Sequence, residues 1–172
     1  FDLADRGQKK KGMNVIAVNF PARNALNTLV EHKHNRLLLT PAIGFKKGDT
    51  ASVIINYEGI PSDGLIISKN QFGKRTFFGD NWPNRAHNWI PCVDDPSDKA
   101  SVEFIVTAPS HYQVISNGIQ LEETNLPGDK KLTHWKEDVP LPTKVMVIGV
   151  ADFAVQHTGF VNNCIPVSSW VY

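Results

Sequence analysis

Alternation between two faces is the pattern that most constrains how this chain folds. In an extended Lys99–Ala108, one face would be wholly apolar and the other mostly polar. The apolar face would carry Val102, Phe104 and Val106, and the opposite face Ser101, Glu103, Ile105 and Thr107. Because successive side chains of a strand point to opposite faces, this segment is predicted to be a half-buried β-strand.

Several β-branched runs bounded by turn residues indicate further strands. They are Thr50–Tyr57, Tyr112–Ser116, Ile119–Glu122, Leu132–Lys136 and Lys144–Val150. Gly and Pro recur about every ten residues, which is the spacing of turns in an all-β domain. The sequence therefore predicts an all-β fold, an antiparallel β-sandwich or a saddle-like arrangement of several sheets.

Two turns are indicated by their residues. Asn117-Gly118 separates two strand-like runs, and this dipeptide favours a type I′ hairpin because both residues tolerate a positive φ. We therefore expect Tyr112–Ser116 to pair with Ile119–Glu122. Asn125–Lys130 is predicted to be a longer turn before the strand Leu132–Lys136.

The segment Ala22–His32 fits two structures. Its apolar residues have spacings that a helix could use, whereas its Asn residues and β-branched residues disfavour one. Asn27–Val30 and Arg36–Leu39, which flank a polar tetrapeptide, also fit a β-hairpin. The hairpin is the favoured alternative.

The composition excludes several classes of protein. The chain has 172 residues, the usual size of one domain, and 41% of them are hydrophobic, which suffices for a core. Its 18 Lys and Arg against 17 Asp and Glu give no electrostatic reason to expect nucleic acid as a partner. Two Cys exclude a disulfide-dense scaffold, and no apolar run approaches the roughly 18 residues of a membrane span.

The segment Asp80–Pro96 differs from the rest of the chain. It contains three Pro, two Trp, one His, one Arg, one Cys and three Asp, and its prolines forbid a long regular element. A long irregular stretch of this kind is often functional, although a structural crossover whose Trp rings fill a core explains it equally simply. Cys92 is expected to be a buried free thiol. His32 and His34 have the spacing of two metal ligands on one strand face, but an exposed hairpin tip is the more ordinary explanation.

The same segment carries a resemblance to a known family. Pro91-Cys92-Val93-Asp94-Asp95-Pro96 resembles the P-C-x-D-x-P signature of the aminopeptidase N family of zinc metallopeptidases. Other matching stretches stand in the family's order along most of the chain. They are Tyr57–Pro61 with Asp63-Gly64, then Pro109, Ser116-Asn117-Gly118, Thr133-His134-Trp135, Pro142 and Val150–Phe153.

The resemblance implies the family's N-terminal, non-catalytic β domain. Residues 1–172 would then be a single β domain without its opening strands, and a catalytic domain would follow Tyr172. Zinc would be bound by that absent domain, with no metal ligand and no catalytic residue in this chain. The whole protein would remove N-terminal residues from peptides, and this domain would pack over the catalytic domain and help to wall the substrate cleft.

The resemblance also indicates where the substrate would touch this domain. The family usually places a Gln or Glu, which binds the substrate's α-amine, nine residues before the first Pro of the signature. That position is Trp82 here, so the chain departs from the family pattern. We therefore expect Asp80, Asn81 or Trp82 to contact the substrate, with Asp80 as the better partner for an ammonium group.

Two further functions are consistent with the sequence. The whole protein could be a family relative that has lost its zinc motif and serves as a scaffold. Alternatively, the chain could be an independent β-sandwich module that binds a ligand on Trp82 and Trp89. Both cytoplasmic and secreted or periplasmic locations are consistent with the sequence, and an uncovered sheet edge would favour pairing with a second chain.

Overall fold

A computed structural model describes residues 1–7, 10–21 and 28–172 of the chain. In this part the regular elements are β-strands, apart from two three-residue 3-10 helices, so the predicted all-β class is confirmed. The chain divides into two compact units. Unit 1 comprises residues 1–65, 80–99 and 142–145, and unit 2 comprises residues 66–79, 100–141 and 146–172.

Unit 1 contains two two-stranded sheets. In the first, β1 (Gly12–Asn19) pairs antiparallel with β4 (Ile54–Ile60), with a β-bulge between Val15 and Ala17. The strand expected at Thr50–Tyr57 therefore begins four residues later and extends three residues further. The second sheet pairs β2 (Thr28–Lys33) with β3 (Arg36–Pro41), also antiparallel.

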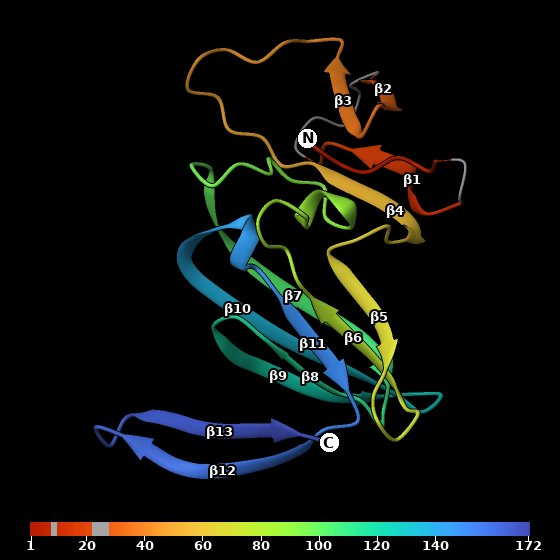
Figure 1. The fold of residues 1–172 in the computed structure, drawn as a ribbon. Coiled ribbons are helices and arrows are strands. Elements are labelled where there is room, and N and C mark those ends of the chain that lie inside the picture. Colours follow the sequence, from red (N-terminus) through yellow and green to blue (C-terminus); the bar gives the residue numbers. More distant parts are fainter. Residues whose placement is uncertain (8–9, 22–27) are drawn as a thin grey trace. The chain divides into compact units, whose positions relative to one another are not determined.

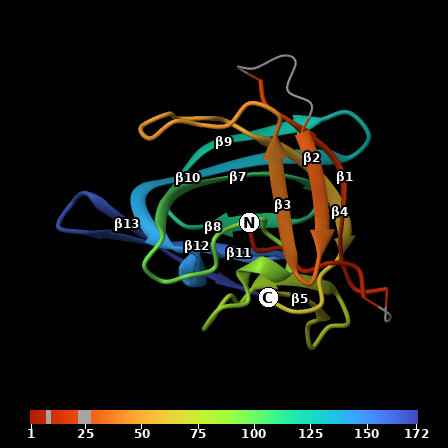
Figure 2. The same cartoon turned by 90° about the horizontal axis from the view of Figure 1, so that it is seen from above.

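The β2–β3 pair confirms the hairpin prediction over the described residues, while residues 22–27 lie outside them. Lys33 pairs with Arg36, so His34 and Asn35 form a two-residue turn, and their φ values are 54° and 58°. Two positive φ values are the geometry of a type I′ turn, which matches the twist of the flanking strands. Figure 2 shows the two strands side by side. His34 is exposed in this turn and does not share a strand face with His32, so the favoured explanation, an exposed hairpin tip, holds for His34 and the two-ligand arrangement does not.

The N-terminal residues of unit 1 connect its parts. Asp2 forms isolated β-bridges with both Arg36 and Cys92. The neighbouring side chains Leu3 and Leu37 are 0% and 1% exposed. Apolar side chains of this unit that are also buried are Ala4, Met13, Ala86 and Trp89. Burial of this apolar surface is the main term that stabilises the unit.

Unit 2 contains a four-stranded and a three-stranded sheet (Figure 1). The four-stranded sheet has the order β5 (Leu65–Lys69), β6 (Arg75–Gly79), β11 (Ile148–Ala151), β8 (Gln113–Ser116). The three-stranded sheet has the order β7 (Lys99–Pro109), β10 (Lys130–Pro142), β9 (Ile119–Leu126). The predicted alternation in β7 is confirmed, because Val102, Phe104 and Val106 are less exposed than the residues between them.

The core of unit 2 draws on both sheets, as in a sandwich. Val114 of β8, Trp135 of β10 and Val150 of β11 are buried together. Phe77, Val106 and Tyr112 are among the partly buried side chains around them. The Trp135 indole Nε1 donates to the Val114 carbonyl oxygen at 2.9 Å, so its polar group is satisfied inside the core.

The predicted hairpin at Asn117-Gly118 is wrong. β8 pairs with β11 and β9 pairs with β10, so the chain passes from one sheet to the other at this turn. Gly118 has a φ of 82°, and a Cβ on it would lie 1.8 Å from the carbonyl oxygen of Lys136. The Asn117 side chain accepts a hydrogen bond from Val147 N at 2.8 Å. Close backbone approach and this side-chain bond, rather than a type I′ hairpin, account for the dipeptide.

The remaining strand predictions are partly confirmed. The turn expected at Asn125–Lys130 connects β9 to β10, which pair antiparallel. In Lys144–Val150, however, only the last residues belong to a strand, β11, because Thr143–Val145 form a 3-10 helix, η2. The chain ends in an antiparallel hairpin of β12 (Ala154–Val161) and β13 (Ile165–Val171).

Candidate functional site

The segment Asp80–Pro96 lies in unit 1 and is irregular, as its three prolines predict, apart from the 3-10 helix η1 (Ala86–Asn88). Asn81 is the internal support of this segment, because its side chain is 1% exposed. Its Oδ1 accepts a hydrogen bond from the Trp89 indole Nε1 at 2.8 Å, and its Nδ2 donates to the Thr143 carbonyl oxygen at 3.3 Å. Asn81 therefore fixes the loop to η2 and orients Trp89.

Tyr57 and Gly64 also hold the segment Asp80–Pro96 in place. The Tyr57 hydroxyl donates to the Trp89 carbonyl oxygen at 2.8 Å, and burial raises the pKa of this hydroxyl, so it remains a donor at neutral pH. Gly64 has a φ of 75°, and a Cβ there would lie 2.2 Å from the carbonyl oxygen of Arg85. The backbone of the segment can approach this closely only because residue 64 has no side chain.

Asp94 of the P-C-x-D-x-P signature ties three parts of unit 1 together. Its side chain is 5% exposed. Oδ2 accepts from His87 N at 3.2 Å and from His87 Nδ1 at 2.7 Å, and Oδ1 accepts from the Thr143 hydroxyl at 2.8 Å. Its own backbone N donates to Asp2 Oδ2 at 3.0 Å. Asp94 thus links η1, η2 and the N-terminal segment.

Cys92 precedes this aspartate and is a free thiol that is only partly exposed. Burial and the nearby carboxylates of Asp94 and Asp2 raise the pKa of the Cys92 thiol to about 12. The thiol is therefore uncharged at neutral pH, which disfavours a nucleophilic role. The prediction of a free thiol is confirmed, and its burial is partial rather than complete.

The three residues expected to contact substrate have different environments. Asn81 is internal, as described above. The Asp80 carboxylate is 44% exposed and pairs with Arg85 Nη2 at 2.8 Å, while Arg85 Nη1 lies 3.4 Å from Asp63 Oδ1. Trp82 is 59% exposed, and the ammonium of Lys144 lies 4.6 Å from its ring centroid. Asp80 and Trp82 thus present a carboxylate and an aromatic face to solvent.

A ligand platform of two tryptophans is not formed. Trp89 is 9% exposed and its indole nitrogen is bonded to Asn81, so its ring fills the core of unit 1. The alternative explanation of the segment, in which Trp rings fill a core, holds for Trp89 and fails for Trp82. An independent binding module built on both rings is therefore wrong.

No metal centre is found in the part of the chain that the structure describes. Across residues 1–7, 10–21 and 28–172, no three His, Cys, Asp or Glu side chains gather in a way that could hold a metal ion. The described residues thus do not fit a zinc site. No helix in this same part of the chain is long and apolar enough to cross a membrane.

The match to a protein family decides what kind of domain this is. Residues 10–145 match the Peptidase M1 N-terminal domain family. The chain belongs to this family. The matched range contains Tyr57, Gly64 and the whole P-C-x-D-x-P signature, so the residues that build the irregular segment are also those that define the resemblance.

Related proteins are consistent with this membership of the M1 N-terminal family. Leucine aminopeptidase 2 of Neurospora crassa is 29% identical over 75 residues, which cover 43% of this chain and 11% of that protein. Glutamyl aminopeptidase of Rattus norvegicus is 30% identical over 80 residues, covering 46% of this chain and 8% of that protein. The chain thus matches only a small part of the length of these relatives.

Solved structures show the same fold. A crystal structure of an M1 zinc metallopeptidase from Deinococcus radiodurans superposes with a TM-score of 0.75 at 21% identity. The superposition covers 97% of this chain and 37% of that one. The E323A mutant of an M1 zinc metallopeptidase from the same organism gives a TM-score of 0.76. The M1 N-terminal fold therefore accounts for nearly the whole chain.

Sequence reasoning missed three residues, Arg85, Thr143 and Lys144, that contact side chains of the segment Asp80–Pro96. Arg85 and Lys144 contact Asp80 and Trp82, and Thr143 binds Asp94. Thr143 lies 49 residues from Asp94 in the sequence, so no local spacing links them. The sequence indicates Arg85 as a partner of Asp80 only weakly. Arg85 follows Asp80 by five residues, within a stretch otherwise rich in aspartate and proline.

Proposed function

We propose that this chain is the N-terminal, non-catalytic domain of a zinc-dependent aminopeptidase that removes N-terminal residues from peptides. The observation that carries the proposal is the family match over residues 10–145. The relatives with the names leucine and glutamyl aminopeptidase support peptide hydrolysis as the activity of the whole protein. In this proposal the domain packs over a catalytic domain and forms part of the wall of the substrate cleft.

The chemistry of hydrolysis would reside outside residues 1–172. Zinc, when bound by the catalytic domain, supplies a Lewis acid and activates a water molecule. The described residues offer no ligand set for it. The contribution of this chain is to shape and position the segment Asp80–Pro96.

Within that segment we assign substrate contact to Asp80 and Trp82 and a positioning role to Asn81. The carboxylate of Asp80 is a suitable acceptor for the α-ammonium of a peptide, and Arg85 holds it in place. Trp82 offers an exposed aromatic face that already has the ammonium of Lys144 beside it. Asn81 is buried and bonded on both sides, so it acts through Trp89 and Thr143 rather than by touching substrate.

Substitutions in the whole enzyme test this assignment. Asp80→Asn and Trp82→Ala are expected to raise KM for an aminoacyl p-nitroanilide several-fold, with a smaller effect on kcat. The matched control Asp95→Asn alters an exposed carboxylate at the other end of the same segment, and Phe72→Ala alters an exposed ring outside it; both should leave KM unchanged. Unchanged KM in both Asp80→Asn and Trp82→Ala would refute substrate contact by this segment.

A second experiment separates the enzyme from a scaffold that has lost its metal. The gene sequence beyond the codon for Tyr172 should encode an H-E-x-x-H motif followed by a further Glu. The encoded protein should then contain about one zinc ion per chain by elemental analysis. A downstream sequence without this motif, together with a zinc-free protein, would favour the scaffold.

A further inference from the structure

Lys144 lies against the exposed ring of Trp82, and a hydrogen bond between their neighbours holds the two together. Asn81 and Thr143, which precede them in the chain, are bonded, because Asn81 Nδ2 donates to the Thr143 carbonyl oxygen. Lys144 belongs to η2 and is half-buried, and its ammonium lies 4.6 Å from the centroid of the Trp82 ring. A positive charge is thus placed beside an exposed aromatic face.

The ammonium of Lys144 has no carboxylate partner within the part of the chain that the structure describes. Its side chain contacts the face of Trp82 and forms no ion pair or hydrogen bond with residues 1–7, 10–21 or 28–172. A ring face attracts the charge without occupying the three N–H donors of an ammonium. The group can therefore still donate to a ligand, and its partial burial strengthens such a bond relative to one in water.

The charges on the two sides of Asn81 have opposite signs. On one side, the carboxylates of Asp80 and Asp63 lie 2.8 and 3.4 Å from nitrogens of Arg85, so two negative charges face one positive charge. The remaining negative charge suits the α-ammonium that we assign to Asp80. On the other side is the ammonium of Lys144. A ligand that carries an ammonium and a carboxylate a few ångströms apart would match both sides.

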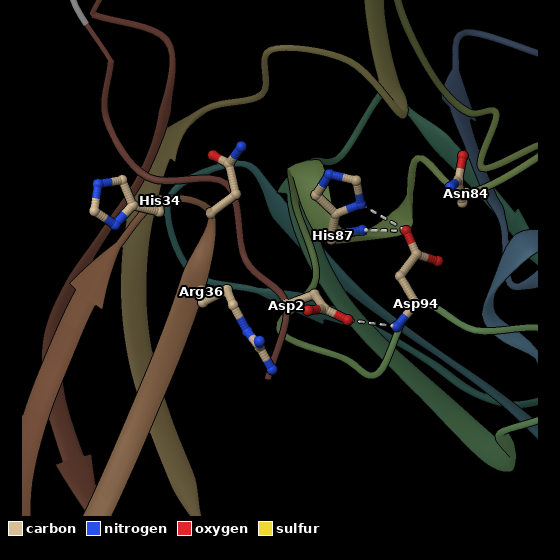
Figure 3. A pocket seen from close by; sticks show the side chains of 7 residues that line it. Asp2, His34, Arg36, Asn84, His87 and Asp94 are labelled. Carbon is tan, nitrogen blue, oxygen red and sulfur yellow. Dashed lines mark hydrogen bonds and ion pairs between the residues drawn. The ribbon is translucent and has the colours of Figure 1, made fainter.

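Asp94 does not neutralise Lys144. Its carboxylate is 5% exposed and accepts two hydrogen bonds from His87, as Figure 3 shows, and a third from the hydroxyl of Thr143. The carboxylate is therefore held inside unit 1, whereas the ring that Lys144 contacts is 59% exposed. An anionic group that lies on this ring would contact the ammonium of Lys144 and not the carboxylate of Asp94.

We propose that Lys144 and Trp82 select an acidic side chain, Glu or Asp, at the N-terminal residue of the peptide substrate. The inference rests on the proposed function, because it needs Asp80 to bind the α-ammonium. Asp80 and Trp82 are two positions apart, so their Cα atoms lie within about 7 Å of each other. The side chain that reaches Trp82 therefore belongs to the residue whose α-ammonium binds Asp80. Its methylene groups would pack on the ring, and its carboxylate would accept from Lys144.

Hydrolysis of glutamyl and glutaminyl p-nitroanilide by the whole enzyme tests the proposal, because the two substrates have the same shape and differ in charge. The parent enzyme should favour the glutamyl substrate at least about fivefold in kcat/KM. Lys144→Gln should lower this ratio about fivefold, and Lys144→Glu should lower it further, whereas Lys144→Arg should retain it because the charge is kept. The matched control Lys33→Gln alters a lysine whose ammonium is already paired with Glu31 at 3.1 Å, and it should retain the parent ratio.

Each ratio is measured within one variant, so a general loss of activity through misfolding cancels. Hydrolysis of both substrates with a ratio that Lys144→Gln leaves unchanged would refute selection by Lys144, while the aminopeptidase function would stand. Equal loss of the preference in Lys144→Arg and Lys144→Gln would also refute it, because charge would then not decide the ratio. Absence of hydrolysis of every aminoacyl p-nitroanilide by the zinc-loaded whole protein would refute the proposed function, and this inference with it.

Discussion

The carboxylate of Asp94 accepts hydrogen bonds from both the backbone N and the ring Nδ1 of His87, at 3.2 and 2.7 Å. These bonds satisfy the backbone N–H of His87 in η1 and fix the ring of His87. A third bond from Thr143 reaches the other oxygen of Asp94. The signature aspartate therefore holds the irregular segment in place through these hydrogen bonds. A carboxylate suits this position because it can accept all three bonds.

Asp94→Ala should lower the free energy of unfolding by about 3 kcal/mol, because it leaves several polar groups without their charged acceptor. Urea denaturation followed by tryptophan fluorescence measures the change. Asp95→Asn is the matched control. Asp95 is exposed, and the bonds that it accepts come from the nearby Ser97. The urea midpoint of Asp95→Asn should therefore stay near that of the parent chain. Equal effects of the two substitutions would contradict the assigned role of Asp94.

Gly64→Ala should be more damaging than Gly128→Ala, although the two glycines have almost the same φ, 75° and 76°. Strain from a positive φ costs both variants about 1 kcal/mol. At residue 64 the new Cβ would also lie 2.2 Å from the Arg85 carbonyl oxygen, whereas at residue 128 it meets nothing within 4 Å. In thermal unfolding, Gly64→Ala should therefore lose at least about 2 kcal/mol more stability than Gly128→Ala. Equal losses of stability in the two variants would refute the close approach.

Cys92 and Cys164 should react at very different rates with a thiol reagent in the native state. Cys164 is exposed, whereas the Cys92 thiol is partly buried and its pKa is raised to about 12. Only the thiolate reacts. At pH 8, therefore, Cys164 should be modified rapidly and Cys92 at least about a hundredfold more slowly. In urea both should react at similar rates. Fast modification of Cys92 in the native chain, identified by peptide mapping, would contradict its environment.

The same raised pKa predicts a loss of stability in alkali. Because the pKa of the Cys92 thiol is about 9 when unfolded and about 12 when folded, the folded state retains a proton that the unfolded state loses. Stability is thus unaffected below about pH 9 and falls as the pH rises toward 12. The slope is at most about 1 kcal/mol per pH unit, since water reaches part of the thiol. Urea midpoints from pH 8 to 10.5 should fall less in Cys92→Ala than in the parent chain.

Local patterns predicted much of the secondary structure. The alternation in Lys99–Ala108 gave β7, and the turn at Asn125–Lys130 was placed between the correct strands. The local chemistry of Asn117-Gly118 favours a hairpin, whereas β8 pairs with β11, from Ser116 with Ile148, 32 positions on, to Gln113 with Ala151, 38 positions on. Long-range pairing of this kind leaves no trace in a short window of sequence.

Composition and resemblance single out the segment Asp80–Pro96 as the candidate site, but they do not indicate which of its side chains are buried and which are exposed. Asn81 was expected to contact substrate, yet it is 1% exposed and bonded to Trp89 and Thr143. The sequence offered no signal for the burial of Trp89 and the exposure of Trp82, seven positions apart in one segment. The environment of Trp89 depends on Gly64 and Tyr57, which lie far away in the chain and contact the segment at Arg85 and Trp89.

Peptide hydrolysis by the 172-residue chain, compared with that by the whole protein, tests the central claim most directly. Both proteins, at equal concentration and with added zinc, are given the same aminoacyl p-nitroanilide. The account predicts hydrolysis by the whole protein, loss of that activity with a chelator, and no rate above background for residues 1–172. Chelator-sensitive hydrolysis by the 172-residue chain alone would contradict it.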